Sequence, residues 1–156
     1  MKNITIVIFS TFFMLSCVYS KEEAKQAKTA TYIETEEFAK MGYPFCEAVR
    51  YGDILYLSGQ IGDLGNSDEL VEGGITEQTR QTMLNIKRVL EQNGSSLDNV
   101  IKCTCMLADI KDWAEMSKEY VKFFPNHKPA RSALGATGLA LGALVEIECM
   151  AYIKSD

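Results

Sequence analysis

The sequence predicts an α+β domain in which two amphipathic helices cover one face of a sheet. Apolar residues alternate along residues 53–61 and 144–153, which is typical of strands, whereas residues 76–93 carry one apolar stripe at helical spacing. A shorter helical stripe follows residue 112. The 156 residues suffice for one domain. The predicted order is β-β-α-β-α-β-β, with both helices on the same face.

The first half of the predicted domain is a hairpin followed by a helix. Residues 45–50 and 53–61 are extended in character and pair as neighbouring strands. We expect Thr76 to cap a helix that runs to Asn93, because Gly94 is a suitable residue to follow a helix end.

The second half supplies three more strands and one helix. Residues 100–108 form a strand, and the segment Asp112–Glu115 has the pattern of a capping box that opens a helix ended by Pro125. Residues 131–137 and 144–153 then complete the sheet.

The last strand carries apolar side chains on both faces. Its odd-numbered residues from Val145 to Ile153 can meet the helices. The even-numbered face mixes apolar and acidic residues, and so does the matching face of residues 54–60. A second face of this kind is more typical of a subunit interface than of a solvent-exposed surface, so we expect an oligomer with polar residues at the interface.

Residues 1–16 have the pattern of a secretory signal peptide rather than of a folded element. One lysine precedes an uncharged run from Ile4 to Leu15, which is too short to span a bilayer. The run stops at Cys17 in a pattern that resembles a bacterial lipobox, so we predict lipidation of Cys17. Residues 17–31 then form the lipidated cysteine and a solvated tether, and residues 32–156 the folded domain.

This N-terminal pattern predicts a protein anchored by lipid in a bacterial cell envelope, on the periplasmic side. Val18 after the cysteine favours the outer membrane by analogy with known sorting. Two alternatives are a plain signal peptide and a true start at Met14, which would leave the protein cytoplasmic.

Composition excludes several classes of function. With 16 basic and 21 acidic residues the net charge is −5, and no basic cluster is present to neutralise phosphates, so we expect no nucleic-acid partner. The single histidine, His127, excludes a His-rich metal site and a triad that needs a second imidazole, and reads as an exposed loop residue. Chemistry must therefore come from arginine, carboxylates, hydroxyls or thiols.

The remaining thiols are Cys46, Cys103, Cys105 and Cys149, and none of their spacings is a CxxC motif. Cys103 and Cys105 share a strand face, where neighbouring positions make poor disulfide geometry. Buried apolar thiols are therefore favoured over disulfides.

Spacing alone gives candidates that each have an ordinary structural explanation. Arg131 has the default interpretation of a surface or salt-bridged arginine. Glu146 and Glu148 lie roughly 7 Å apart on one strand face, which suits a carboxylate pair and equally a solvated strand. Gly59, between Ser58 and Gln60 in mid-strand, indicates either a close approach by a ligand or another backbone, or a bulge.

Taken together and in order, five segments resemble the RidA/YjgF family of imine/enamine deaminases. The similarity runs from Gly42 to Tyr152, which is nearly all of the folded part. The segments are 42–49, 55–61, 78–86, 129–132 and 145–151. The resemblance implies a chorismate-mutase-like fold and a homotrimer with its sheets inward. It also implies three sites in the clefts between subunits, with no metal or organic cofactor.

The resemblance also implies roles for individual residues. Arg131 matches an arginine that grips the substrate carboxylate through its planar fork, and Glu146 matches a carboxylate that holds the attacking water. Phe45 matches an aromatic wall. The substrate-binding positions implied are Phe45, Ser58, Gly59, Ser117 and Ala133. Phe45, Ser117 and Ala133 replace a tyrosine, an asparagine and a cysteine found in many or some members, which predicts a different substrate.

Two functions follow as hypotheses. The first is hydrolysis of small 2-imino or enamino acids to 2-keto acids and ammonia. The second is non-catalytic binding of a small carboxylate-bearing metabolite in the same cleft. Arg131 and Glu146 together favour the enzyme, because a carboxylate binder has no use for a nearby anion.

Overall fold

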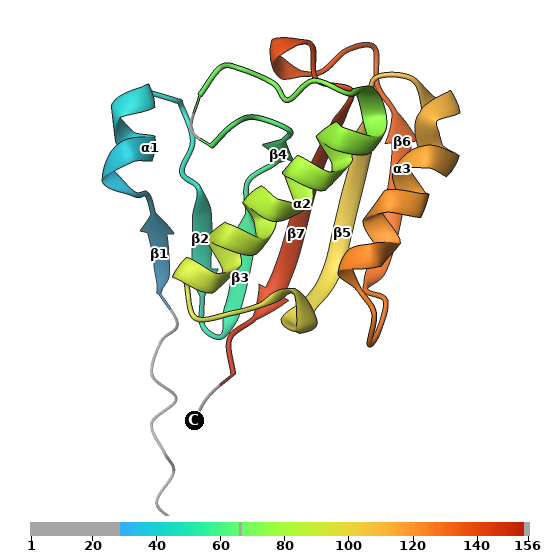
Figure 1. The fold of residues 1–156 in the computed structure, drawn as a ribbon. Helices are drawn as coiled ribbons and strands as arrows, with labels where there is room; N and C mark the ends of the chain where they lie inside the picture. The colour runs from blue at the N-terminus through green and yellow to red at the C-terminus, as the bar shows by residue number, and fades with distance from the viewer. Residues whose placement is uncertain (1–28, 66, 155–156) are drawn as a thin grey trace, which may run out of the picture.

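The computed structural model describes residues 29–65 and 67–154, which form one sheet with helices against it (Figure 1). The strand order is β1-β2-β3-β7-β5-β6, and the short β4 also pairs with β7. All pairs are antiparallel except β5 with β6. The strands are β1 (Ala30–Ile33), β2 (Ala48–Tyr51), β3 (Ile54–Leu57), β4 (Gln60–Ile61), β5 (Val100–Leu107), β6 (Ala130–Gly135) and β7 (Val145–Tyr152).

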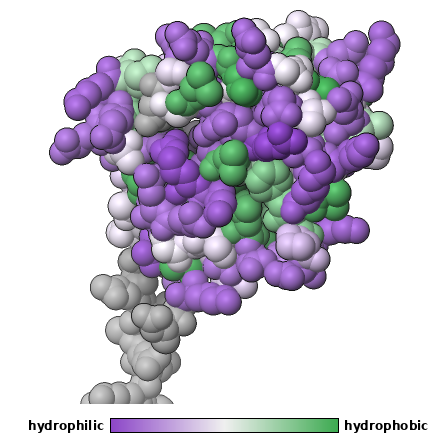
Figure 2. Space-filling view, in the orientation of Figure 1, coloured by the Kyte–Doolittle hydropathy of each residue, from purple (hydrophilic) through white to green (hydrophobic). Residues whose placement is uncertain are grey.

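Helices α2 (Gly74–Gln92) and α3 (Trp113–Tyr120) lie across the same face of this sheet, as Figure 1 shows. The predicted α+β fold is therefore confirmed. Figure 2 views the helix side, where hydrophilic side chains cover most of the surface around a smaller apolar area.

The core lies between the sheet and these helices. Alternate residues of the central strands are buried, while Met83, Ile86 and Leu90 of α2 are fully enclosed against them. Burial that alternates along the strands and follows one stripe of the helix is the pattern that the sequence predicted. Three thiols belong to this layer as buried free cysteines: Cys103, Cys105 and Cys149.

The N-terminus of α2 differs from the prediction. The capping position is Gly73, with φ 109° and no side-chain cap. The Thr76 hydroxyl instead donates to Glu115 Oε1 at 2.6 Å and so links α2 to α3. The predicted stop is confirmed, because Asn93 ends the helix and Gly94 follows with φ 72°.

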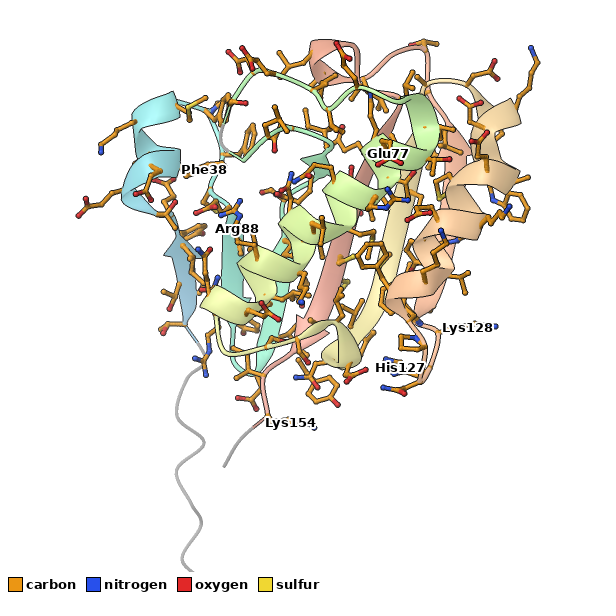
Figure 3. The ribbon with its side chains drawn as sticks, in the orientation of Figure 1. Phe38, Glu77, Arg88, His127, Lys128 and Lys154 are labelled. Carbon is orange, nitrogen blue, oxygen red and sulfur yellow. The ribbon has the colours of Figure 1, made fainter. Side chains whose placement is uncertain are left out.

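The predicted capping box of α3 is also wrong. Asp112 adopts helical angles and makes no side-chain cap. Asp109 takes the capping role, because its Oδ1 accepts from the Lys111 N–H at 3.0 Å at the start of a 3-10 turn that leads into α3. The helix ends at Tyr120, and a second 3-10 turn precedes Pro125. His127 lies exposed in the following loop, as expected (Figure 3).

The sequence predicted neither the short helix α1 (Glu36–Met41) nor the edge strand β1, whose first two residues, Ala30 and Thr31, lie in the expected tether but pair with β2. Thr35 caps the helix by accepting from the Phe38 N–H at 3.2 Å, and Gly42 ends it with φ 67°. The buried Glu47 fixes its position, because this carboxylate accepts from the Thr35 N–H at 2.8 Å and pairs with Arg88 of α2 at 3.4 Å. Helix α1 thereby carries Phe38 to the end of the sheet where β3 meets β4.

Candidate active site

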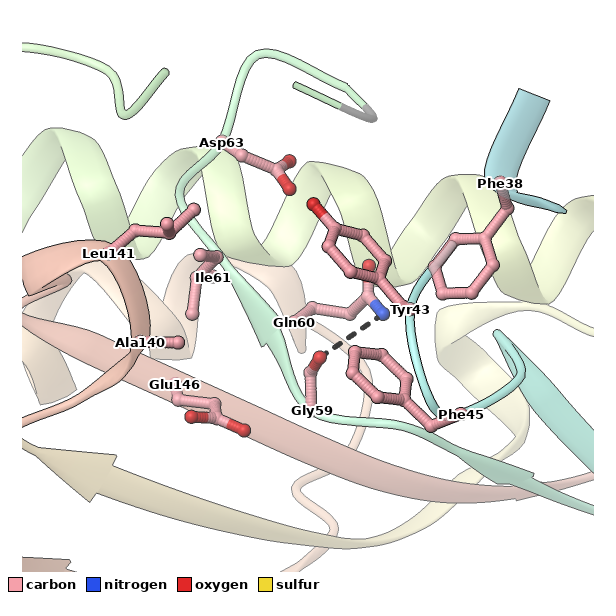
Figure 4. A pocket seen from close by; sticks show the side chains of 10 residues that line it. All are labelled: Phe38, Tyr43, Phe45, Gly59, Gln60, Ile61, Asp63, Ala140, Leu141 and Glu146. Atoms are coloured by element: carbon pink, nitrogen blue, oxygen red, sulfur yellow. Dashed lines mark hydrogen bonds between the residues drawn. The ribbon is translucent and has the colours of Figure 1, made fainter. Parts of the chain in front are cut away.

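A pocket of about 290 Å³ opens where β3 gives way to β4 (Figure 4). Its lining combines apolar side chains with two carboxylates, those of Asp63 and Glu146. Of the five substrate-binding positions expected from the sequence, Phe45 and Gly59 line it. Glu146 joins them from β7.

Gly59 occupies the break between β3 and β4, directly against the Glu146 side chain. A methyl group at position 59 would overlap the Glu146 carboxylate. The approaching group is thus a side chain of the protein itself, rather than the ligand, second backbone or bulge that the sequence predicted. Any residue larger than glycine at this position would displace the carboxylate from the pocket.

Ser58 lies beside the pocket rather than in its lining. Its hydroxyl donates to the Cys46 carbonyl at 2.6 Å, and its backbone N–H donates to the Glu47 carbonyl at 3.0 Å. These bonds join the end of β3 to the segment before β2. The Ser58 hydroxyl proton is thus used within the fold.

Both pocket carboxylates have raised pKa values, and burial is the main cause. Burial raises the pKa of Glu146, and the nearby Glu148 adds to this effect. Burial also raises the pKa of Asp63, although N–H groups of Gly65 and Asn85 donate to its Oδ1 at 3.3 and 2.7 Å and oppose the shift. A carboxylate with a raised pKa is a stronger base, as proton transfer near neutral pH requires.

Arg131 lies in a different environment, beneath α3. Its Nη2 donates to Ser117 Oγ at 2.9 Å, and its guanidinium carbon lies 4.9 Å from the ring centroid of Tyr120 and 5.5 Å from that of Trp113. Two aromatic faces and one hydroxyl therefore hold the guanidinium in place. Ala133 lies two residues further along the same strand face and packs against the core.

The default interpretation of Arg131 as a surface or salt-bridged residue does not hold. It is half-buried, and within residues 29–65 and 67–154 no carboxylate forms an ion pair with it. A half-buried guanidinium with free donors is suited to bind an external carboxylate through two parallel hydrogen bonds.

Glu146 and Arg131 point to opposite faces of the sheet. Val145 and Ile147 are buried against the helices, so Glu146 between them points away from the helices. Arg131 contacts α3 and therefore points toward them. One chain consequently cannot bring both groups to one small molecule. Sequence patterns did not predict this separation, nor the contacts of Trp113 and Tyr120 with Arg131.

A family model described as Endoribonuclease L-PSP matches residues 36–153. The chain belongs to this family. Among similar members, a "RutC family protein" of Pyrococcus horikoshii is 42% identical over 120 residues, covering 77% of this chain and 95% of the relative. The human "2-iminobutanoate/2-iminopropanoate deaminase" is 37% identical over 108 residues, covering 69% and 79%.

The solved structure of yeast Mmf1 has the same fold as this family member. It superposes with a TM-score of 0.72 at 34% sequence identity, covering 81% of this chain and all of that one. A structure from Yersinia pestis, described as a protein of unknown function of the conserved Rid protein family, gives a TM-score of 0.70 at 34% identity, covering 80% of this chain and all of that one. The resemblance to the RidA/YjgF family is thereby confirmed.

The predicted envelope localisation is wrong on these comparisons. The relative "Protein MMF1, mitochondrial" of Saccharomyces cerevisiae is 35% identical over 127 residues, covering 81% of this chain and 87% of the relative, and its name places it in an organelle rather than in a bacterial envelope. Cys17 and the predicted signal peptide lie outside the described residues. Among residues 29–65 and 67–154 no helix is long and apolar enough to cross a membrane.

Proposed function

We propose that this family member hydrolyses 2-imino or enamino acids to 2-oxo acids and ammonia, at clefts between the subunits of a homotrimer. The proposed domain is residues 32–156 together with Ala30 and Thr31, the first two residues of β1. The observation that carries the proposal is the placement of Arg131 and Glu146 on opposite faces of one sheet, each free to meet a ligand. We call Arg131 with its surroundings one half-site, and Glu146 with its pocket the other. The two half-sites form one complete site only where neighbouring chains meet. The deaminases among the relatives support the reaction class.

Each half-site supplies a distinct part of the chemistry. Arg131 binds the substrate carboxylate through its fork and fixes the orientation of C2. Glu146 accepts a proton from a water molecule as the water oxygen attacks C2. The electron pair of the C=N bond passes to the nitrogen, which takes up the proton from Glu146 and gives a carbinolamine. The hydroxyl of this carbinolamine then loses its proton to form the C=O bond, while the nitrogen takes up a second proton. The C–N bond breaks with its electron pair passing to the nitrogen, which releases ammonia and leaves the 2-oxo acid. The raised pKa of Glu146 suits it both to accept and to return this proton.

The remaining positions serve these two groups. Ser117 orients Arg131 through its hydroxyl, and Gly59 leaves room for the Glu146 carboxylate. Phe45 forms part of the pocket wall. The backbone N–H of Ala133 lies on the Arg131 strand and is the candidate second donor to the substrate carboxylate. No metal or organic cofactor takes part in this scheme.

The homotrimer draws support from the sheet face that α2 and α3 leave uncovered. A groove on this face is lined by Tyr56, Leu57, Thr104 and Met150, with Lys102 and Glu148 among them. Tyr56 is 41% exposed in the single chain. Neighbouring chains that cover this face remove its apolar surface from water and bring the opposite charges of Lys102 and Glu148 to the subunit interface.

The decisive experiment mixes two inactive variants. Arg131→Ala and Glu146→Gln proteins are each assayed alone, then unfolded, mixed in equal amounts and refolded. In the proposed trimer, every mixed assembly contains one cleft with both native residues, so random mixing restores about a quarter of the wild-type activity. The assay couples an amino-acid oxidase, which generates imines, to trapping with semicarbazide. Recovery absent from the mixture would contradict the intersubunit site.

The same proteins distinguish the enzyme from a carboxylate-binding protein. Glu146→Gln keeps the shape of the side chain, so it should bind 2-oxo acids normally while hydrolysing imines slowly. If wild type and Arg131→Ala lower the trapped product equally, or if neither lowers it, the deaminase proposal fails. Binding of 2-oxobutyrate without imine hydrolysis would then establish the alternative, a non-catalytic trimer that binds small carboxylates.

The description of the family as endoribonuclease makes RNA cleavage a necessary control. Two carboxylates and no Lys or Arg line the described pocket, which disfavours a phosphodiester there. We therefore expect no RNA cleavage under conditions in which imines are hydrolysed.

A further inference from the structure

The pocket beside Glu146 is a slot between an aromatic wall and an aliphatic wall. The rings of Tyr43 and Phe45 are stacked, with an interplanar angle of 1° and centroids 5.3 Å apart, and Phe38 meets both rings edge-on. Ile61 and Leu141 face them across the slot, as Figure 4 shows. The Glu146 carboxylate lies at the base.

Both walls expose more apolar surface than the fold requires. Phe45 is 47% exposed and Leu141 is 52% exposed, although each is a large hydrophobic side chain. Leu141 also has φ 55°, a left-handed conformation that non-glycine residues seldom adopt. Backbone strain at an exposed leucine indicates that the loop holds this side chain over the slot for a purpose other than core packing.

The slot is large compared with the reacting group of an imino acid. Its volume is about 290 Å³, whereas an apolar cavity of about 150 Å³ already accommodates benzene. The Gln60 Nε2 donates to the Ser58 and Gly59 carbonyls at 3.3 and 3.4 Å, so this amide does not present an unpaired N–H donor to the slot. The space beyond Glu146 is therefore lined mainly by apolar side chains and is open to an extra side chain of the substrate.

We propose that this slot binds the side chain of the substrate, and that the preferred substrates are 2-imino acids with a large branched or aromatic side chain. This inference rests on the proposed function. With the imine carbon at Glu146, the substituent on C3 extends between the aromatic and aliphatic walls. An alanine-derived imine has no group to place there and leaves the apolar walls in contact with water.

The two pocket carboxylates set a second selectivity. Asp63 and Glu146 both line the slot without a cationic neighbour among the described residues that line it. An acidic substrate side chain would be repelled and desolvated there, so imines of dicarboxylic amino acids should be poor substrates. A cationic side chain would meet Asp63 only after crossing the apolar walls, at the cost of its hydration.

The test compares imines of alanine, leucine, phenylalanine, lysine and glutamate, generated by oxidases at equal rates and trapped with semicarbazide. We expect kcat/KM for the leucine and phenylalanine imines to exceed that for the alanine imine by about tenfold or more. Leu141→Ala should lower this ratio about tenfold, because it removes much of the aliphatic wall. The matched control is Leu84→Ala, which changes an exposed leucine of α2 outside the pocket and should leave the ratio unchanged.

A binding measurement separates failure of this inference from failure of the proposed function. Calorimetry compares 2-oxo-3-phenylpropanoate with 2-oxopropanoate on wild type and on Leu141→Ala. Tighter binding of the phenyl compound, lost in Leu141→Ala, supports the slot even if no imine is hydrolysed. Rates that are equal across side chains, or highest for alanine or lysine imines, overturn the slot assignment while leaving the deaminase proposal intact. If hydrolysis is absent, equal affinities of the two 2-oxo acids likewise overturn it.

Discussion

The two half-sites differ in how tightly the fold holds them. Around Arg131, two aromatic rings and the Ser117 hydroxyl fix one guanidinium at the edge of the sheet. Around Glu146, the side chain accepts no hydrogen bond from the described residues and borders an open pocket. The first half is suited to a group that every 2-imino acid shares, the carboxylate. The second is suited to groups that vary between substrates.

This difference indicates where the protein gains affinity and where it gains selectivity. A prearranged cation binds a carboxylate without loss of side-chain freedom, so its contribution is the same for all substrates. An apolar slot contributes in proportion to the area that a particular side chain covers. Changes at the Arg131 half should therefore affect all imines alike, whereas changes at the Glu146 half should depend on the substrate or on pH.

The largest effect is expected when the two halves are kept apart. Tyr56→Arg places a charge on the uncovered sheet face, where an unpaired buried charge costs about 3–5 kcal/mol. Light scattering should find a folded monomer, and imine hydrolysis should be lost with assembly. Tyr32→Arg is the control, because Tyr32 is 74% exposed on the edge strand β1. A Tyr56→Arg monomer that retains full activity would contradict a site shared between subunits.

The next effect concerns the shape of the cation. Arg131→Lys keeps the charge but loses the planar fork and its stacking on Tyr120 and Trp113. We expect kcat/KM to fall roughly 10²-fold for every imine tested, nearly as far as in Arg131→Ala. Arg50→Lys changes an exposed arginine and should have no effect. A fall in kcat/KM confined to bulky imines would show that Arg131 contributes to side-chain selectivity rather than to binding of the shared carboxylate.

A smaller effect is expected from crowding Glu146. Gly59→Ala would push the carboxylate out of position and lower kcat by roughly tenfold to 10²-fold. A double-mutant cycle with Glu146→Ala supplies the control, since the added methyl group has nothing to displace once the carboxylate is gone. Equal losses from Gly59→Ala in both backgrounds would mean that the glycine acts on the strand break rather than through Glu146.

The smallest effect is a shift in the pH profile. Glu146 must be ionised to accept a proton, so activity falls as the pH drops through its raised pKa. Glu148→Gln removes the like charge, lowers the pKa of Glu146 and should move this acidic limb toward lower pH by less than about one unit. Glu115→Gln, on the helix side, should leave the limb in place. A shift toward higher pH after Glu148→Gln would exclude Glu146 as the titrating group.

Much of the fold was determined by the sequence alone. The helix over residues 76–93 and the strands near residues 100–108 and 144–153 follow from hydrophobic period, because burying a stripe or an alternating face is the dominant local signal. The helix starts were not determined in this way. Thr76 and Asp112 have the chemistry of capping residues, yet Thr76 bonds to Glu115 of a neighbouring helix, and Asp109 takes the cap before α3.

For the site, the sequence determined which residue types were available, and the tertiary structure decided their relations. Gly59 was identifiable because glycine is unfavourable in a strand without a close neighbour. The tertiary structure decides that this neighbour is Glu146, because β4 pairs with the distant β7. It also decides that the Ser58 hydroxyl donates to the Cys46 carbonyl. The opposed directions of Arg131 and Glu146 likewise follow from which face of the sheet the helices cover, and that choice is made only when the core closes.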